Sequence, residues 1–589
     1  MSRDETPEEQ EGHKKVNAFS GIMKYFSNKV LLAFAMIFAV FGGAMPLLMN
    51  IFMGNMVNVL TDGSNFLHNF LPIIYKLIGF NCAQVVCMAI NMQLRFFANP
   101  LFMRDLRKNL YKSMLEKDIE FFDLVPTGVL VGRISEDVTL VHEIFVDKLC
   151  TVIQMLAQSL SGLILSFVVM WPAALIGVGA IGCAAIVYYI GEKIVAKIWI
   201  QYNESSSAAS SKAEEILTSF RTIKSFDCEL KEADLYKKTL DSVDAVFKKS
   251  SIAQGFKDGV IVLILDGLQA GVLYFAAWMV QKKPSYGYET GDLFIIVMSL
   301  SFATLGISSA LTLSDDFKKT GVSATKILEI IESKPKVNRK EGGSLEEVKG
   351  KIEFRDVSFK YATADTYAVR HLSFTINPGE TVAFVGESGC GKSTTLQLIQ
   401  RFYEIESGTI LLDDVDMKTL SPLFIRSQIS IVPQSPVLFS MSILDNIRYA
   451  NPKNTSDAEV AEAARIGNAH NFIMEMPENY KSIVEQSSLS GGQKQRICIS
   501  RAIVAHAPIL LLDEATAALD TESEKLVQQS LEQFRKGKTA IIVAHRLSTV
   551  MNADKIFVFS HGKVVETGNH KQLIELGGIY ADLVKFQLQ

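Results

Sequence analysis

The sequence predicts a membrane α-helical part with six transmembrane helices and long cytosolic extensions, followed by an α/β P-loop domain. Three observations lead to this fold class. The mean hydropathy is +0.21 although 21% of the residues are charged, which is typical of an apolar part joined to a soluble part. Six apolar runs are long enough to cross a bilayer. Later in the chain, short β-rich runs alternate with helical ones, and one of them leads into a glycine-rich loop.

Length and composition exclude several classes of protein. At 589 residues the chain is too long for one ordinary domain. Its net charge of −4 gives no support for nucleic-acid binding. Its seven scattered cysteines show neither metal-ligand spacing nor a disulfide framework. Residues 1–20 are polar and acidic, unlike a signal or transit peptide, and we expect them to form a disordered cytosolic tail.

The six predicted spans lie in a membrane domain that we place at residues 21–334. Each is long enough to cross the hydrocarbon core as a helix. The third and fourth spans meet at Trp171 and Pro172, in a tight turn without charge. The spans are residues 29–54, 70–98, 149–171, 172–192, 257–281 and 292–314.

The distribution of lysine and arginine predicts the orientation of these spans. The segments after the first and third spans contain neither residue, whereas those after the second and fourth spans are rich in lysine. Only Lys282 and Lys283 lie on the supposed outer side. We therefore expect an integral multi-pass protein with both termini and the soluble domain in the cytosol, in the plasma membrane.

The two cytosolic connections between spans are unusually long and keep helical periodicity with charged faces. One interpretation is that the membrane helices continue into the cytosol as rigid struts. The other is that they form ordinary solvated helical hairpins. The sequence alone does not separate the two.

The soluble domain is expected at residues 351–589, after a charged, glycine-containing linker at 335–350. A predicted strand leads into Gly386-x-x-x-x-Gly391-Lys392-Ser393 and then into a helical run. The glycines allow backbone N–H groups to surround phosphates, and the helix dipole favours an anion. Lys392 adds a charge at the β- and γ-phosphates, and Ser393 supplies a ligand for Mg²⁺. A chance glycine-rich turn is the alternative, and the strand–loop–helix context disfavours it.

Two acids end a second predicted strand, and a histidine follows a third. Asp513 lies where Mg²⁺ needs a ligand, at the carboxyl end of a buried strand. Glu514 can then polarise the attacking water. The alternative is that both acids cap a helix. His545 is placed to bond the γ-phosphate, although a lone histidine there would more often have no role in the chemistry.

With these residues the chain resembles the ATP-binding-cassette family, and Leu-Ser-Gly-Gly-Gln at 489–493 is similar to its signature motif. The resemblance implies catalytic roles for Glu514 and His545 and places Asp520 in the D-loop. The implied ATP-binding residues are Tyr361 on the adenine, Gly386, Ser388, Gly389, Cys390, Gly391, Lys392, Ser393, Thr394, the Q-loop residue Gln434 and Asp513. The implied Mg²⁺ ligands are Ser393, Gln434 and Asp513. The implied contacts to the ATP of a partner are Leu489, Ser490, Gly491, Gly492 and Gln493.

The resemblance also covers the membrane part, where residues 116–138 and 213–229 are similar to the two intracellular loops of type I exporters. Within the family the chain is most similar to P-glycoprotein-like multidrug exporters. It carries one membrane half and one cassette and so resembles a half-transporter. In this family two cassettes meet head to tail, which implies a homodimer, with a heterodimer as the alternative. One departure is the segment before the signature, which is shorter than the family pattern and offers Glu485 in place of its usual glutamate.

The resemblance implies ATP-driven export of amphipathic or hydrophobic small molecules by alternating access, in contact with membrane lipid. A lipid flippase or a peptide or metabolite exporter of the same architecture remains open. An ATP-gated channel or regulator is the alternative from a different class. Asp266, in the fifth span, is a candidate for the substrate cavity because a membrane acid is costly, although it could also serve helix packing. Asn81, Gln84, Asn91 and Gln93 make one side of the second span polar, as expected for a wet cavity wall.

Overall fold

The computed structural model describes residues 18–62, 66–282, 286–339, 341–484, 489–513, 521–543 and 550–588. The chain forms two compact units. The first contains the residues up to Leu110 and residues Arg133–Glu329, and the second contains Tyr111–Gly132 and the residues from Ile330 onward. The predicted N-terminal tail lies almost entirely outside the described residues.

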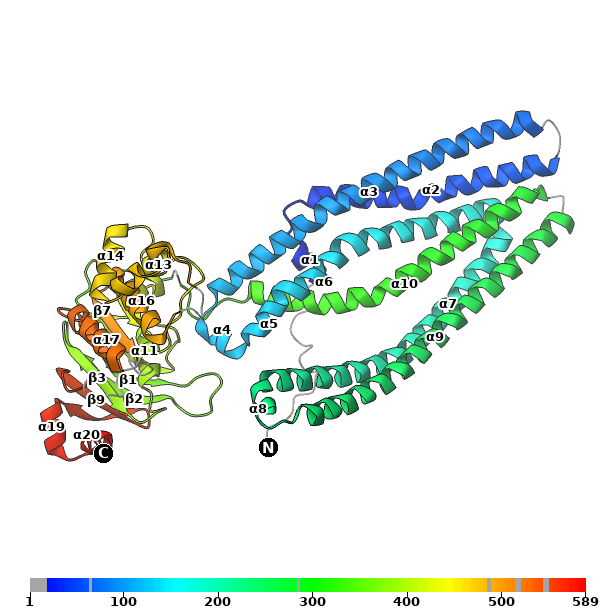
Figure 1. The fold of residues 1–589 in the computed structure, drawn as a ribbon. Helices are drawn as coiled ribbons and strands as arrows, with labels where there is room; N and C mark the ends of the chain where they lie inside the picture. Colours follow the sequence, from blue (N-terminus) through cyan, green and yellow to red (C-terminus); the bar gives the residue numbers. More distant parts are fainter. Residues whose placement is uncertain are drawn as a thin grey trace. The chain divides into compact units, whose positions relative to one another are not determined.

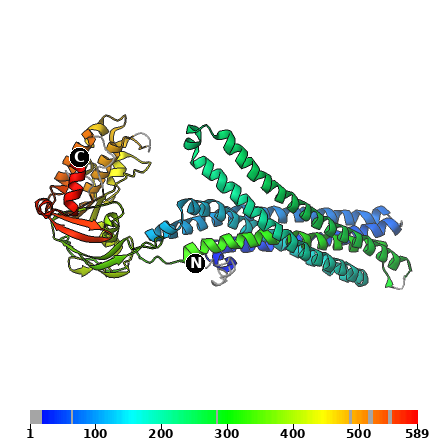
Figure 2. The same ribbon diagram turned by 90° about the horizontal axis from the view of Figure 1, so that it is seen from below.

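The first unit is built from long helices (Figure 1). Helices α7 and α9 run alongside each other, as two views show (Figures 1 and 2). The elements are α1 (Ala18–Met23), α2 (Lys29–Asp62), α3 (Phe66–Glu116), η2 (Arg133–Asp137), α6 (Val138–His142), η3 (Glu143–Lys148), α7 (Leu149–Thr218), α8 (Phe220–Ser225), α9 (Glu229–Lys282) and α10 (Thr290–Glu332).

Five helices among the described residues are long and apolar enough to cross a membrane. They account for all six predicted spans, because α7 contains both the third and the fourth. Met170 breaks that helix with φ −149° and ψ 81°, directly before Trp171 and Pro172. Proline has no N–H to donate and begins a helix readily, so the second limb starts there without a separating loop. Within α7 the chain reverses direction (Figure 1).

The helices extend well beyond the predicted spans. Helix α3 continues to Glu116, α7 continues to Thr218 and α9 begins at Glu229. Beyond the predicted spans, α3, the second limb of α7 and α9 each stay helical without a separate hairpin, which favours the interpretation of long extensions.

The second unit contains an α/β domain with two sheets. A four-stranded antiparallel sheet has the order β2–β1–β4–β5. A six-stranded sheet has the order β10–β9–β3–β8–β7–β6 and is parallel except at β10. The strands are β1 (Ile352–Phe359), β2 (Val369–Ile376), β3 (Thr381–Gly386), β4 (Ser407–Leu412), β5 (Val415–Asp416), β6 (Ile429–Val432), β7 (Ile509–Asp513), β8 (Thr539–Val543), β9 (Lys555–Ser560) and β10 (Lys563–Gly568).

The parallel sheet sets the position of the functional loops. Strands β3, β7 and β8 are buried almost throughout, as expected for parallel strands covered on both faces. Because they are parallel neighbours, their carboxyl ends meet at one edge of the sheet. Strands β3, β7, β8 and β6 end at that edge with Gly386, Asp513, Val543 and Val432, respectively.

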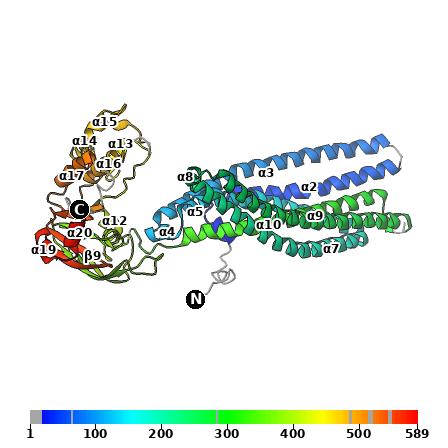
Figure 3. The same cartoon turned by 60° about the horizontal axis from the view of Figure 1, so that its bottom comes forward.

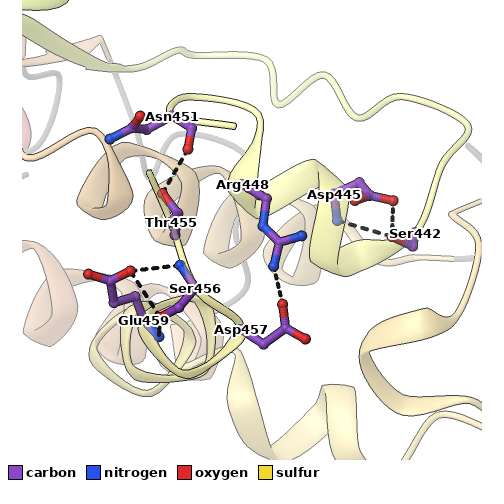
Figure 4. Close-up of polar contacts among 8 residues, drawn as sticks. All are labelled: Ser442, Asp445, Arg448, Asn451, Thr455, Ser456, Asp457 and Glu459. Atoms are coloured by element: carbon purple, nitrogen blue, oxygen red, sulfur yellow. Dashed lines mark hydrogen bonds and ion pairs between the residues drawn. The ribbon is translucent and has the colours of Figure 1, made fainter. Parts of the chain in front are cut away.

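Helices cover these sheets, and α13 to α17 gather on one side of the domain (Figure 3). Serine caps start two of them: Ser442 accepts from the N–H of Asp445, and Ser456 forms a reciprocal capping box with Glu459 (Figure 4). The helices of this unit are α4 (Ile119–Leu124), α5 (Thr127–Gly132), α11 (Lys392–Ile399), α12 (Pro422–Ser427), α13 (Ile443–Arg448), α14 (Asp457–Ile466), α15 (His470–Met474), η5 (Asn479–Lys481), α16 (Gly491–Val504), α17 (Thr521–Phe534), α19 (His570–Leu576) and α20 (Ile579–Leu588).

The segment predicted as a linker, residues 335–350, packs against this domain in part. The Asp413 carboxylate accepts hydrogen bonds from the backbone N–H groups of Lys349, Gly350 and Lys351 at 2.7–3.2 Å. Gly343 exchanges backbone hydrogen bonds with the Thr419–Ser421 turn. The composition of a linker did not indicate these contacts.

Candidate functional site

The phosphate loop joins β3 to α11 at the carboxyl edge of the parallel sheet. Its three glycines all have positive φ, at 150° for Gly386, 77° for Gly389 and 103° for Gly391. Side chains other than glycine rarely adopt these values. These values let the loop turn back on itself, which is the backbone conformation that allows N–H groups to surround a phosphate.

Gly391 is constrained by both its conformation and its neighbours. A Cβ atom there would lie 2.7 Å from the carbonyl oxygen of Ala368, and the residue also caps α11 in a left-handed conformation. Around Gly389 there is open space within 4 Å. At position 391 both the positive φ and the close Ala368 carbonyl oxygen require a glycine. At position 389 only the positive φ favours one.

Lys392 is buried under the loop. Its Nζ donates to the carbonyl oxygens of Gly386 and Glu387 at 2.8 and 2.7 Å and lies 3.6 Å from the sulfur of Cys390. The ammonium group thus holds the loop together in this structure. A phosphate would offer it stronger, charge-assisted acceptors in place of the two neutral carbonyls.

Two of the three predicted magnesium ligands, Ser393 and Asp513, lie close together although they belong to different elements. Ser393 Oγ on α11 is 3.3 Å from Asp513 Oδ1 at the end of β7, although the residues are far apart in the sequence. Hydroxyl and carboxylate oxygens are ligands that Mg²⁺ accepts, and Mg²⁺ usually completes its coordination with water and substrate phosphates. The third predicted ligand, Gln434, lies exposed just after β6. Among the described residues, three or more His, Cys, Asp or Glu do not gather at any one point as a ready-made metal cage.

The predicted adenine-binding residue Tyr361 is tied to the helix after the phosphate loop. Its hydroxyl contacts Thr394 Oγ1 at 3.0 Å and Gln397 Oε1 at 2.6 Å. Burial raises the pKa of its phenol, so the ring stays neutral at physiological pH. Its ring also meets the ring of Tyr403 edge-on at 5.3 Å.

The signature motif forms the start of α16. Ser490 is the N-cap: its Oγ accepts from the N–H of Gln493 at 3.2 Å, and the Gln493 side chain accepts from the N–H of Ser490 at 2.9 Å. This reciprocal pair is a capping box. Ser490 and Gly491 are exposed, while Leu489 and Gly492 are buried. The Ser490 hydroxyl proton and the N–H of Gly491 can therefore meet an external anion, which the helix dipole also attracts.

Three predicted site residues, Glu514, Asp520 and His545, and also Glu485, lie outside the described residues. The described strands end next to two of them, since β7 ends at Asp513 and β8 ends at Val543. The chain therefore leaves the sheet at the phosphate-loop edge immediately before Glu514 and just before His545.

Comparisons with known proteins decide the family. Residues 32–306 match the family described as "ABC transporter transmembrane region", and residues 369–517 match the family described as "ABC transporter". ABC transporter B family member 4 from Dictyostelium discoideum is 34% identical over 99% of this chain and 76% of its own length. This chain belongs to the ABC transporter family. The B family name of its relatives confirms the predicted resemblance to the P-glycoprotein-like branch.

Other relatives in the B family are considerably longer than this chain. Member 1 from Dictyostelium discoideum is 35% identical over 95% of the chain and 61% of its own length. Member 13 from Arabidopsis thaliana is 39% identical over 82% of the chain and 39% of its own length. The match of residues 369–517 implies ATP binding by this part of the chain. What these longer proteins do as wholes applies to this chain only as a proposal.

The sequence prediction did not include Tyr403. Its Oη donates to Asp123 Oδ2 on α4 at 2.6 Å, and α4 lies in the segment similar to the first intracellular loop. A single tyrosine in a helix–strand connection carries no local signal. Only the fold brings it between Tyr361 and Asp123.

The first unit contains a cavity of about 370 Å³ among α7, α9 and α10. It combines aromatic, apolar and charged side chains, as expected of a site for an amphipathic molecule. Its lining includes Tyr188, Trp199, Lys257, Asp258, Ile261, Ser308 and Asp316. A second, smaller cavity shares Tyr188, Ile261 and Ser308 with it.

A partly buried ion pair borders this cavity through Lys257. Lys257 Nζ lies 2.9 Å from Glu192 Oε2 and over the ring of Tyr188 at 4.9 Å. The lysine stem crosses α7 at Gly191, where a Cβ atom would lie 2.5 Å from Lys257 Cγ. Glycine at 191 thus allows α9 to approach α7 closely enough for the pair to form.

One expectation about the membrane helices stays a prediction, and another changes. Asp266 is exposed on α9, lines neither of these cavities, and makes no hydrogen bond or ion pair within the described residues. Its substrate role stays a prediction. The wet-wall interpretation is wrong for Asn91, which is buried and donates to the Ala35 carbonyl oxygen on α2 at 2.6 Å. Asn91 joins two helices because an amide in an apolar interior must find a partner.

Proposed function

We propose that this chain is one half of an ATP-driven exporter, in which two copies assemble and move amphipathic or hydrophobic small molecules across the plasma membrane. The observation that carries the proposal is the contact of Ser393 with Asp513. It brings the predicted magnesium ligands together beside a phosphate loop, in a chain that also has a helical membrane unit.

In this proposal ATP binds across the edge of the parallel sheet. The loop N–H groups and Lys392 hold the phosphates, and the ring of Tyr361 stacks on the adenine. Ser393, Gln434 and Asp513 hold Mg²⁺, which when bound neutralises charge on the β- and γ-phosphates. Lys392 has to leave the carbonyl oxygens of Gly386 and Glu387 to reach the nucleotide.

Hydrolysis is assigned to residues that follow the strand ends. Glu514, next to Asp513, polarises the attacking water, and His545 donates to the γ-phosphate. The resemblance assigns Asp520 to the D-loop of the same site. An ATP-gated channel or regulator, the alternative, would not require efficient ATP turnover. An acid at position 514 favours efficient turnover and so argues against this alternative.

The signature supports assembly of two copies. Ser490 and Gly491 are exposed at a helix N-terminus, and together with the Gly492 amide they would bind the γ-phosphate of ATP held by the partner. Each chain supplies one phosphate loop and one signature, so a two-fold dimer completes two identical sites. ATP then favours the closed dimer by its higher affinity for that state and drives alternating access of the membrane cavity. A heterodimer would place two different sequences in the two sites.

Complementation tests the assembly. Lys392→Met should fail to bind ATP, and Ser490→Ala should bind it without occluding it. The two chains are mixed and reconstituted in lipid vesicles. In each mixed dimer, one of the two ATP sites then has an intact Lys392 opposite an intact Ser490, and the other site has both residues altered. We expect the mixture, and neither variant alone, to occlude nucleotide. Failure of the mixture, with both chains shown to co-purify, would argue against a composite site.

A substrate panel tests the transport class. ATPase activity is measured in lipid vesicles with amphipathic drugs, lipids and peptides added in turn. Stimulation by drugs supports the proposal, and stimulation by lipids or peptides alone would favour the flippase or peptide-exporter alternative. Glu514→Gln should abolish turnover in every case, and full activity of that variant would disprove its catalytic assignment.

A further inference from the structure

The hydroxyl of Tyr361 makes two hydrogen bonds to α11, the helix that begins at the phosphate loop. Its Oη lies 2.6 Å from Gln397 Oε1 and 3.0 Å from Thr394 Oγ1. Thr394 and Gln397 are three residues apart and therefore share one face of the helix. The residue predicted to stack on adenine is thus fastened to the helix of the phosphate loop, although it lies 33 residues before Thr394 in the chain.

The chemistry of the three groups fixes the direction of both hydrogen bonds. An amide oxygen only accepts, so the single proton of the Tyr361 hydroxyl goes to Gln397 Oε1. The contact with Thr394 then uses the threonine hydroxyl as donor and the Tyr361 oxygen as acceptor. Only the bond to Gln397 therefore uses the proton of Tyr361.

The two bonds should respond differently to ATP. Thr394 is itself a predicted ATP-binding residue, and a phosphate oxygen is a stronger acceptor for its hydroxyl than a neutral phenol. When Thr394 turns its proton to a phosphate, its bond to Tyr361 is lost. Gln397 has no predicted contact with the nucleotide, so its bond to Tyr361 persists when ATP binds.

The surroundings of Tyr361 leave this bond a definite task. The rings of Phe359 and Tyr403 both meet the Tyr361 ring edge-on, at centroid distances of 5.0 and 5.3 Å. Tyr361 is nevertheless only partly buried, so part of its ring is open to a base. A hydrogen bond is directional. The bond to Gln397 therefore fixes the position of the hydroxyl and, with it, the direction of the ring.

We propose that Gln397 is a positioning residue that holds the Tyr361 ring ready for adenine, in a fixed place relative to the phosphate loop. Stacking requires an ordered ring, and ordering a free side chain during binding costs conformational entropy. The bond to Gln397 removes this cost because the ring is ordered before ATP arrives. The inference rests on the proposed function, in which Tyr361 stacks on the adenine, and adds a residue that acts through Tyr361 without touching the nucleotide.

The test compares full-length variants in lipid vesicles. Gln397→Met keeps the length of the side chain and removes the acceptor, and Tyr361→Phe keeps the ring and removes the donor. The Kd for MgATP is measured beside that for inorganic tripolyphosphate, which has phosphates but no base. We expect the Kd for ATP to rise about three- to tenfold in either variant, as for the loss of one preordered side chain, and the Kd for tripolyphosphate to stay within about twofold.

ATPase kinetics provide a second readout. Gln397→Met should raise the KM for ATP by the same factor as the Kd and leave kcat unchanged, because Gln397 is remote from the reacting phosphate. A variant that merely disturbs the phosphate loop would lower kcat and weaken tripolyphosphate binding as well. Either of these two results would overturn the inference.

A double-mutant cycle and a matched control separate positioning from general structure. In the Tyr361→Phe background there is no proton to donate, so Gln397→Met should cause no further loss of ATP affinity. Gln400→Met is the control: Gln400 directly follows α11, and its side chain donates to the Leu396 carbonyl oxygen at 3.1 Å. This variant should bind ATP like the unchanged protein. Additive losses in the cycle, or an equal loss in Gln400→Met, would contradict the role of Gln397.

Tyr361→Ala distinguishes failure of this inference from failure of the proposed function. Loss of the stacking ring should weaken ATP binding about tenfold or more. If Tyr361→Ala weakens ATP binding but Gln397→Met and Tyr361→Phe bind ATP normally, only the inference fails. If the unchanged protein binds no ATP, or Tyr361→Ala binds it equally well, the proposed nucleotide site fails together with the inference.

Discussion

Tyr403 Oη donates a 2.6 Å hydrogen bond to Asp123 Oδ2, while the Tyr403 ring meets the ring of Tyr361 edge-on. One side chain thus separates the predicted adenine-binding residue from the short helix α4. Tyr361, in turn, is bonded to α11 of the phosphate loop through Thr394 and Gln397. A shift of the Tyr361 ring on adenine binding would therefore reach α4 through one intermediate side chain, Tyr403.

Tyr403→Phe tests this route because it keeps the ring and removes the hydrogen bond to a carboxylate. We expect ATP affinity to remain near that of the unchanged protein and stimulation of ATPase activity by transported compounds to fall several-fold. Tyr480→Phe is the control, since it loses a 2.8 Å contact with His470 elsewhere in the same domain. Equal losses in both variants would mean that the effect is general destabilisation.

The same tyrosine should resist ionisation. Burial, and then the hydrogen bond to Asp123, raise the pKa of Tyr403 above its usual value. Folding therefore favours the protonated phenol, and this stabilisation is complete below about pH 10 and is lost as the pH rises through the folded-state pKa. Between about pH 9 and 11, the folded unchanged protein and Tyr403→Phe should show the same increase in tyrosinate absorbance. After unfolding, the tyrosinate absorbance of the unchanged protein should exceed that of Tyr403→Phe by the contribution of one tyrosine. An absorbance difference between the two folded proteins in this pH range would contradict the prediction.

The phosphate loop offers a matched pair of glycines. Gly391→Ala combines positive φ with a clash against the Ala368 carbonyl oxygen, whereas Gly389→Ala brings positive φ alone. We expect Gly389→Ala to cost about 1–2 kcal/mol and Gly391→Ala to cost more. ATP affinity should follow the same order. Calorimetric unfolding and nucleotide titration of the two variants check this, and equal effects would show that the Ala368 contact does not constrain the loop.

The position of Cys390 predicts that thiol alkylation inhibits ATPase activity. Its thiol lies inside the phosphate loop, 3.6 Å from Lys392 Nζ, and is 6% exposed. A maleimide attached there would occupy the loop, so alkylation should abolish ATPase activity, and prior binding of ATP should slow the reaction. Cys390→Ala should remain active after the same treatment, and inhibition of that variant to the same extent would place the sensitive thiol elsewhere.

Gly191 allows the pair of Lys257 with Glu192 to form and offers a test of the α7–α9 contact. Gly191→Ala should destabilise the protein by about 1–3 kcal/mol, because the near end of the lysine stem has to move. Gly182→Ala, on the same helix but with open space around its Cβ, should be neutral or slightly stabilising. Thermal unfolding in detergent compares them, and a lower melting temperature for Gly182→Ala than for Gly191→Ala would contradict this account.

Local patterns predicted most of the fold. The phosphate loop depends on glycines at fixed spacing after a buried strand, and the signature depends on a serine and a glutamine three residues apart at a helix start, so both are visible in a few residues. The spans were visible because hydrocarbon selects for apolar length. The missing loop inside α7 follows from Pro172, which can begin a helix shortly after the break at Met170.

Tertiary contacts account for what could not be predicted. A polar residue in a span has the same local signature whether it faces water, as was expected of Asn91, or bonds to a neighbouring helix, as Asn91 does with Ala35. The bridge from Tyr361 through Tyr403 to Asp123 depends on three segments whose proximity is set by the sheet order. In the sequence, Gln495 and Arg501 look like ordinary positions of an amphipathic helix. Only the fold shows that they donate hydrogen bonds to Pro433 and Val437, on either side of Gln434.

The capping box at Ser490 has a consequence for the energetics of assembly. Because Ser490 and Gln493 already close the first turn of α16 within one chain, the proposed recognition element is ordered before a partner would bind. Association therefore does not have to order a flexible loop, which would cost conformational entropy for each residue fixed. More of the free energy of ATP binding remains for moving the membrane helices.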